Sequence, residues 1–132
     1  MLTYLRNAAG IFFVLVVPTE ARSLNLEQAL QDTAAHINKS APRPIGNDTY
    51  LDGAVAYEKT LKYRFSFRSL EKKDVSSAFA MKQTEFLTDF VCNRPDMQVF
   101  VENGVTLKYA YHDKHGKLVV VITVDTRTCG SE

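Results

Sequence analysis

The sequence predicts an α+β protein, a two-layer sandwich in which helices cover one face of a four-stranded antiparallel sheet. Three observations support this fold class: a helical segment comes first, two pairs of strand-like segments follow, and a helical stretch separates the two pairs. The expected order of elements is α-β-β-α-α-β-β. No internal repeat or interdomain linker interrupts this order, so one domain is expected.

The first predicted helix covers residues 26–38. Asn25 followed by Gln28 resembles a capping box at its start. Residues 40–47 contain two prolines and a glycine, which predict the end of the helix and an irregular crossing. The apolar positions of the helix recur at three-to-four spacing and are Leu26, Leu30, Ala34 and Ile37.

The next two segments are predicted to form a hairpin. Residues 50–57 are the weaker strand, because Gly53 and Ala54 lower its propensity. In residues 60–68 apolar and polar side chains alternate, which predicts one apolar face and one basic face. The apolar positions are Leu61, Tyr63, Phe65 and Phe67, and the alternate positions are Lys62, Arg64, Ser66 and Arg68.

A long and a short helix are expected between the two hairpins. Asp74 can cap the long helix, which runs to about Cys92, and Pro95 and Gly104 delimit the short one. The residues of the long helix that share one stripe are Val75, Phe79, Lys82 or Gln83, Phe86 and Phe90.

The second hairpin is predicted from residues 105–124. Its first strand alternates apolar and polar residues over 105–111, and residues 113–116 form a turn with Gly116 free to take a positive φ. The final strand, 118–124, is apolar on both faces, so we expect it inside the sheet rather than at its edge.

Residues 1–21 are typical of a secretory signal peptide. Arg6 supplies a positive start, residues 8–17 are apolar, and residues 19–21 offer a small-x-small cleavage pattern, with cleavage after Ser23 as the second choice. The apolar run covers only about 15 Å as a helix, which favours cleavage over a stable membrane span. Neither cleavage site is followed by Cys, so lipid attachment there is not expected. Residues 22–132 form the predicted domain, and its expected location is periplasmic or secreted.

Two cysteines, Cys92 and Cys129, lie in the predicted domain. In an oxidising compartment two such thiols usually pair. A bridge closing this loop stabilises a fold by about 4 kcal/mol in the chain-entropy model. The alternative, a reactive thiol, is disfavoured because no CxxC motif is present.

Composition and motifs narrow the chemistry. The 132 residues carry 16 Lys and Arg against 15 Asp and Glu, a net charge of +1, which argues against a nucleic-acid partner. No catalytic motif or cofactor-binding fingerprint occurs, so no catalytic residue and no cofactor are predicted, and an enzyme is not the favoured class. His112, Asp113 and His115 could offer metal ligands, but exposed turn histidines are more often solvated, and no metal site is predicted.

The basic face is the candidate binding site. Lys62, Arg64 and Arg68, joined by Lys108 on the next predicted hairpin, could meet an acidic partner or anionic lipid head groups. The alternative is a solvated sheet face whose charges prevent aggregation.

Four segments resemble a group of small exported bacterial proteins: 48–52 (DTYLD), 91–97 (VCNRPDM), 103–106 (NGVT) and 109–117 (YAYHDKHGK). That resemblance implies location and fold, and it transfers no functional residue. In layout and in having one cysteine pair, the chain is also similar to the small periplasmic pilotins that escort outer-membrane secretins.

These observations favour an exported bacterial protein that acts by macromolecular binding. It would be an accessory factor of an envelope or secretion assembly, or an inhibitor or immunity protein, with another envelope protein as partner. The alternative is a small-molecule or lipid-binding module with a pocket between sheet and helices, and the third is a hydrolase without a recognisable motif. The oligomeric state is left open.

Overall fold

The computed structural model describes residues 2–3, 17–18 and 25–130. Within the first two ranges, β1 (Leu2–Thr3) pairs antiparallel with β2 (Val17–Pro18). Most of the predicted signal peptide, 1–21, lies outside the described residues, and its cleavage stays a prediction.

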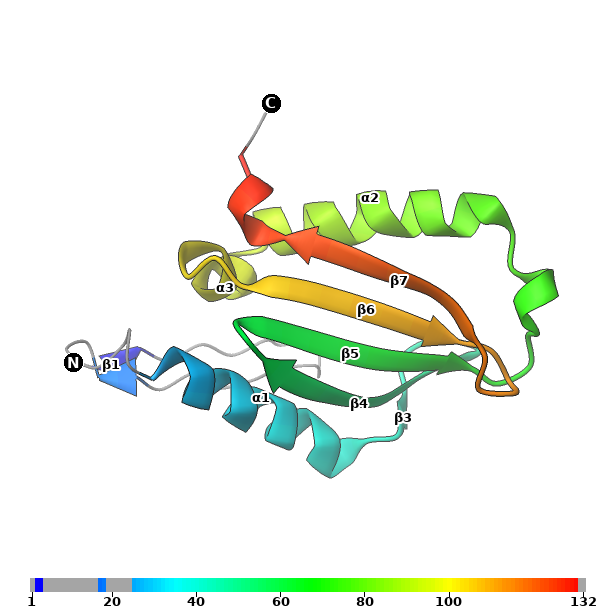
Figure 1. The fold of residues 1–132 in the computed structure, drawn as a ribbon, viewed down its shortest axis with the longest axis horizontal. Coiled ribbons are helices and arrows are strands. Elements are labelled where there is room, and N and C mark those ends of the chain that lie inside the picture. Colours follow the sequence, from blue (N-terminus) through cyan, green and yellow to red (C-terminus); the bar gives the residue numbers. More distant parts are fainter. Residues whose placement is uncertain (1, 4–16, 19–24, 131–132) are drawn as a thin grey trace.

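The main sheet has five strands in the order β3-β4-β5-β6-β7 (Figure 1). Neighbouring strands are antiparallel except at the centre, where β5 and β6 run parallel. The strands are β3 (Arg43–Pro44), β4 (Thr49–Tyr57), β5 (Thr60–Phe67), β6 (Thr106–His112) and β7 (Leu118–Asp125).

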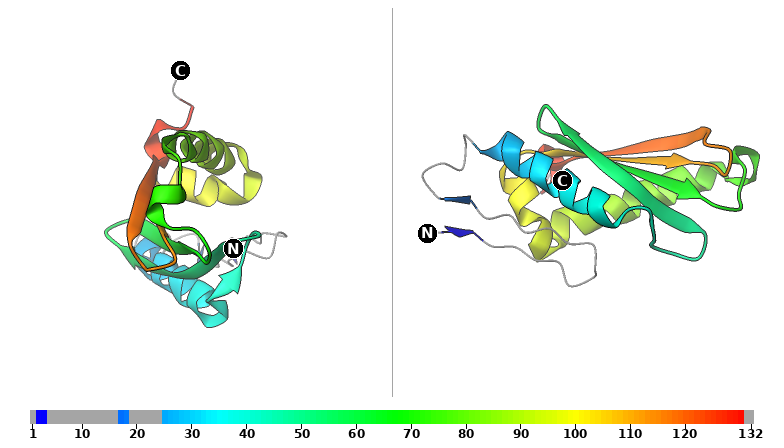
Figure 2. Two further views of the ribbon diagram at one scale, coloured as in Figure 1. Left: turned by 90° about the vertical axis from the view of Figure 1, so that its right-hand side faces the viewer. Right: turned by 90° about the horizontal axis from the view of Figure 1, so that it is seen from below.

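In the described ranges, three α-helices accompany the sheet: α1 (Leu26–Ser40), α2 (Ser77–Asn93) and α3 (Gln98–Glu102). Seen nearly along the strands, the sheet curves, with α2 and α3 near its β7 end and α1 near its β4 end (Figure 2). The apolar sides of α1 and α2 enter one hydrophobic core with the inward side chains of the strands. The α+β class is therefore confirmed.

The parallel central pair corrects the prediction of an antiparallel four-stranded sheet. The chain leaves the end of β5, and α2 then runs back along the length of the sheet (Figure 1). The next strand, β6, must therefore start at the end where β5 starts, which is the geometry of a crossover connection. Local alternation does not encode which strands of the two hairpins meet.

The edges of the sheet also differ from the prediction. We expected 118–124 inside the sheet, but β7 is an edge strand, and Val121 is 38 % exposed on its outward face. The other edge holds β3, two residues in the segment expected to be irregular, paired with β4 through Arg43 and Leu51. A two-residue strand carries no alternation that could predict it.

Aromatic rings fill the covered face of the two central strands. The parallel register places Tyr63 opposite Tyr109 and Phe65 opposite Tyr111, with ring centroids 5.1 Å and 5.0 Å apart. Phe79 of α2 meets the Tyr111 ring edge-on at 5.3 Å. Offset and edge-on aromatic pairs add to the stabilisation from apolar burial.

Two helix details differ from expectation. Phe86 was placed on the buried stripe of the long helix, but it is 58 % exposed, and α2 buries Leu87 and Val91 instead. This helix packs mainly along one edge strand, β7, which needs only a narrow stripe. Its N-cap residue is Ser76 rather than Asp74, and α1 begins at Leu26 without a side-chain capping hydrogen bond from Asn25.

Side chains of α1 cover the outer edge of β4. The Asn38 amide accepts a hydrogen bond from the Ala54 N–H at 2.8 Å and donates one to the Ala54 carbonyl at 2.9 Å. Gln31 donates to the Ala56 carbonyl at 3.0 Å. Residue 53 must be glycine for this approach, since a Cβ there would lie 2.8 Å from Asn38 Oδ1. The helix thus satisfies backbone groups that an unpaired edge exposes.

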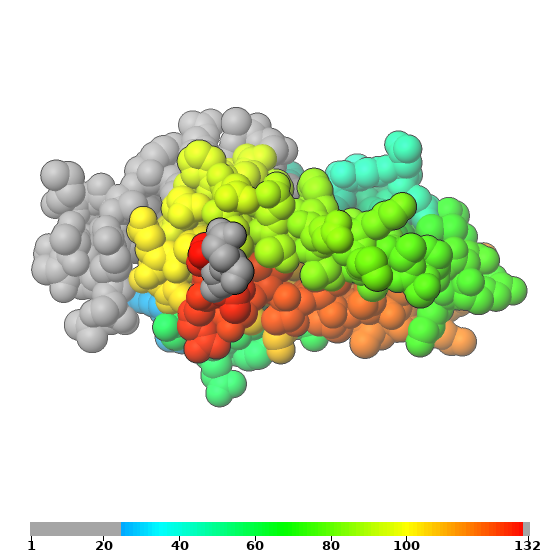
Figure 3. All heavy atoms as spheres, turned by 90° about the horizontal axis from the view of Figure 1, so that it is seen from above, coloured from blue at the N-terminus to red at the C-terminus, as the bar shows by residue number. Residues whose placement is uncertain are grey.

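A disulfide joins Cys92 in the last turn of α2 to Cys129, with 5.3 Å between their Cα atoms. Cys129 directly follows the 3-10 turn 126–128 at the end of β7. Seen from above, this C-terminal segment lies against the end of α2 (Figure 3). The pairing agrees with the sequence expectation and fastens the long helix to the sheet edge it covers.

Candidate functional site

The face of the sheet that the helices leave uncovered carries the predicted basic residues. Lys62 and Arg64 alternate with the core residues of β5, and the parallel register sets them opposite Lys108 and Ala110 of β6. The basic residues of β5 and Lys108 of β6 therefore lie on the same face of the sheet. The sequence analysis grouped them on this assumption.

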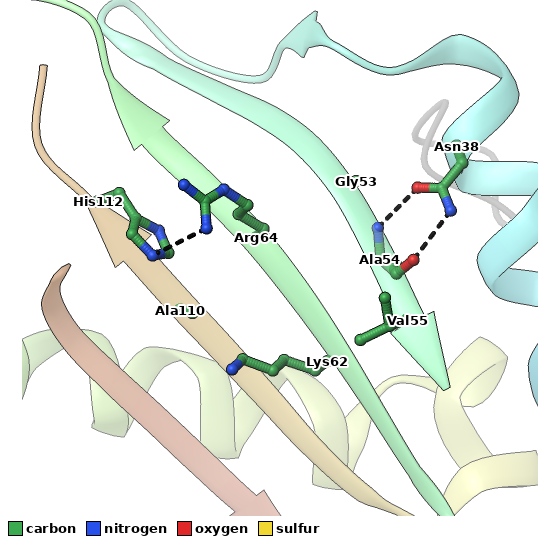
Figure 4. A pocket seen from close by; sticks show the side chains of 8 residues that line it. All are labelled: Asn38, Gly53, Ala54, Val55, Lys62, Arg64, Ala110 and His112. Carbon is green, nitrogen blue, oxygen red and sulfur yellow. Dashed lines mark hydrogen bonds between the residues drawn. The ribbon is translucent and has the colours of Figure 1, made fainter. Parts of the chain in front are cut away.

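A shallow depression of about 380 Å³ lies on this face. It is formed where β4, β5 and β6 run side by side, with an α1 side chain at its rim (Figure 4). The residues that line it are Asn38, Gly53, Ala54, Val55, Lys62, Arg64, Ala110 and His112. Small residues on β4 and β6 make the hollow, because longer side chains there would fill it.

Arg64 is braced by a histidine. Its Nη1 lies 3.1 Å from His112 Nε2, and His112 Nδ1 lies 3.3 Å from the Phe65 carbonyl oxygen. A guanidinium can only donate, so Nε2 accepts, and the ring hydrogen sits on Nδ1 and is donated to the carbonyl. The imidazole thereby holds the Arg64 side chain over β6.

The cations of this face differ in whether an acid neutralises them. Among the residues that the structure describes, no ion pair forms at Lys62, Arg64 or Lys108. Arg68, just past the end of β5, lies 3.4 Å from an Asp52 carboxylate oxygen and 4.0 Å above the Tyr50 ring. The structure therefore separates Arg68, which has local partners, from the other three.

The sequence alternative of a metal at the β6–β7 turn meets a different geometry. Asp113 is only 3 % exposed, and its carboxylate accepts hydrogen bonds from the backbone N–H groups of Lys72, His115 and Lys117 at 2.8–2.9 Å. Burial raises the pKa of Asp113, but these donors outweigh it and lower the pKa below its ordinary value. Asp113 thus ties the turn to the chain before α2, and no group of three metal-ligating side chains gathers within the described ranges.

The groups with raised pKa values lie away from the depression. Burial in the core raises the pKa of Tyr63. Burial also raises the pKa of Tyr109, and electrostatic interaction with the hydroxyl groups of Tyr63 and Tyr111 raises it further. Burial also raises the pKa of Tyr111, and the hydrogen bond from Gln83 partly opposes this. The eight residues around the depression include no hydroxyl, thiol or carboxylate side chain. Its chemistry is suited to holding an anion.

Sequence reasoning found Lys62, Arg64 and Lys108 but missed what surrounds them. His112 was considered only as a metal ligand, and Val55 and Ala110 were not singled out. One signal was present: His112 follows Lys108 at even spacing, so both lie on one strand face. The register that brings them beside Arg64 is not visible in the sequence.

In the described part of the chain, no helix is long and apolar enough to span a bilayer.

Solved structures share this fold. A candidate secreted protein of Pseudomonas aeruginosa superposes with a TM-score of 0.69 at 20 % identity, covering 80 % of this chain and 94 % of that one. The pilotin EpsS of the Vibrio vulnificus type 2 secretion system gives 0.66 at 10 % identity, covering 86 % and 100 %. The type II secretion system pilotin AspS of Vibrio cholerae gives 0.61 at 15 % identity, covering 83 % and 99 %. At these identities the likeness establishes the fold alone.

Comparison with curated proteins gave no match. A family model matches residues 25–121, which span the chain from the start of α1 into β7. That range holds the whole depression and its basic residues. The chain therefore belongs to the family described as a domain of unknown function, DUF8479.

Proposed function

We propose that this protein is an exported, periplasmic or secreted, accessory factor of an envelope or secretion assembly that works by binding another envelope protein. The observation that carries the proposal is the uncovered sheet face, where Lys62, Arg64 and Lys108 stand together without carboxylate partners among the described residues. Arg68, the fourth predicted binding residue, lies just past the end of β5 and is paired with Asp52, so it is not part of this unpaired cluster.

Three further points support the proposal. The fold is shared with two proteins named as pilotins of type II secretion systems, which fits a role in such an assembly. The Cys92–Cys129 bridge suits an oxidising compartment. Like charges on one face, unneutralised within the fold, cost free energy that an acidic partner would recover, and they accelerate encounter with such a partner.

Charge reversal on the face tests the proposal. The triple variant Lys62→Glu, Arg64→Glu and Lys108→Glu should recover at least about tenfold less of the main envelope partner in affinity purification from the host, since it converts attraction to repulsion. Quantitative mass spectrometry measures the recovery. The matched control reverses three exposed lysines elsewhere, Lys82, Lys114 and Lys117, for the same change in net charge.

Equal recovery by the two triple variants, both shown to be folded by circular dichroism, would contradict the proposal. Recovery of a secreted enzyme or toxin instead of an envelope component, with the same loss in the face variant, would assign the protein to inhibitors or immunity proteins.

A further inference from the structure

We propose that the depression beside Arg64 is a receptor for a single carboxylate of an acidic polypeptide segment, which Arg64 holds through two hydrogen bonds while Lys62 supplies the second positive charge. This inference rests on the proposed function and names the chemistry by which a partner would be recognised.

The spacing of the two cations fits one small anion. Lys62 and Arg64 are next-but-one residues on β5, so their Cα atoms lie about 6.8 Å apart along the strand. Both side chains extend toward β6, one on each side of Ala110 (Figure 4). Ala110 has only a methyl group and lines the depression, so its side chain does not fill the space between the two cations.

The His112 contact orients the guanidinium. His112 Nε2 occupies one N–H of Nη1, at 3.1 Å, and the ring itself is held by the Phe65 carbonyl. The hydrogens on Nε and Nη2 of Arg64 take part in no hydrogen bond to the other described residues. A planar fork with two parallel donors matches a carboxylate, and fixing the fork beforehand reduces the entropy lost on binding. His112 is therefore a positioning residue.

The size and walls of the depression favour a peptide over a lipid surface. About 380 Å³ lies at the small end of ligand sites and suits one side chain with its backbone. Val55, 55 % exposed on the β4 side, offers apolar contact to the methylene groups of a glutamate. A membrane surface instead attracts many basic residues without fixed geometry, and it cannot enter a concave site on a sheet.

An NMR titration of the ¹⁵N-labelled protein tests this inference. The probe is a capped peptide of two glutamates flanked by glycines, compared with the same peptide carrying glutamines. We expect saturable shifts with a midpoint of about 1–10 mM, centred on the Arg64 Nε–H and the backbone amides of Ala110 and His112. The glutamine peptide should leave these signals unchanged.

Three variants separate geometry from charge. Arg64→Gln should weaken the glutamate peptide at least about tenfold, and Arg64→Lys, which keeps the charge but loses the fork, about fivefold. His112→Phe should weaken it about threefold and shift the Arg64 Nε–H signal before any peptide is added. The control Lys82→Gln removes a charge from the exposed surface of α2. It should change neither the affinity for the glutamate peptide nor the Arg64 Nε–H signal.

Several results would overturn the inference: no saturation by 50 mM peptide, an affinity for Arg64→Lys equal to that of the unaltered protein, or stronger binding to phosphatidylglycerol vesicles than to the peptide. If envelope capture depends on the basic face while the peptide does not bind the depression, the inference fails and the proposed function stands. If the peptide binds as expected but capture is insensitive to charge reversal, the proposed function fails instead.

Discussion

The two faces of the central strands are made from alternate residues of the same segments, yet they differ in burial and in charge. On the covered face Tyr63 and Tyr109 stack in the core, and one residue further along β5 the side chain of Arg64 is exposed on the other face, opposite the small, buried Ala110 of β6. One face excludes water and accounts for most of the apolar burial. The other carries polar and charged side chains such as Arg64 and Lys108, and we expect substitutions of these two residues to leave the fold intact.

Removing the disulfide should produce one of the two largest effects, because it releases the helix that covers the aromatic face. Replacing Cys92 and Cys129 by serine should lower the free energy of unfolding by about 4 kcal/mol, as estimated for a 37-residue loop. Urea denaturation measures the change. Adding reductant should not lower the free energy of unfolding of the serine variant any further. An unaltered midpoint after reduction of the parent protein would contradict a structural role for the bridge.

A pair of neighbouring residues on β6 compares the two faces directly. Leu107 is fully buried, and Leu107→Ala should lower the free energy of unfolding by about 2–5 kcal/mol through lost burial and a cavity. Lys108→Ala, one residue away on the uncovered face, should change it by less than about 0.5 kcal/mol. Thermal and urea unfolding of both variants provide the measurement. Similar losses at the two positions would mean that the uncovered face is also structural.

Asp113 gives a smaller, pH-dependent effect at the turn where both faces end. Asp113→Ala should lower the melting temperature more than the control Asp89→Ala, because Asp113 accepts three backbone hydrogen bonds. Its pKa is lowered in the folded protein, so the stabilisation is complete above the ordinary value of 3.8 and is lost as pH falls through the lower value. The difference between the two variants should therefore shrink in acid, which melting curves at pH 7 and below pH 3 measure. A constant difference would refute the role of the charged carboxylate.

The sequence predicted the strand and helix whose apolar pattern repeats clearly over neighbouring residues. The alternation around Tyr63 identified a strand, an apolar face and a basic face, and all three are present. The spacing of Leu30 and Ile37 identified α1 and its buried side. These features follow from the periodicity of a single segment, which is local information.

Features that depend on pairing between distant segments were missed. The parallel register of β5 and β6 arises from the crossover through α2, and it alone brings His112 next to Arg64. Phe86 is exposed because α2 packs mainly against one strand, β7, and buries only a narrow row of its side chains there. The basic residues of the candidate site could thus be predicted, but the hollow between them could not, because three strands and a helix contribute to it.

The amide of Asn38 has a consequence for behaviour at high concentration. Both main-chain groups of Ala54 are already engaged, so a strand from a second molecule finds no hydrogen-bonding partner at that position along the border of the sheet. Polymers that grow by strand addition need a continuous row of such groups. We therefore expect two atoms of one side chain to hinder templated fibre growth from that side in crowded solutions.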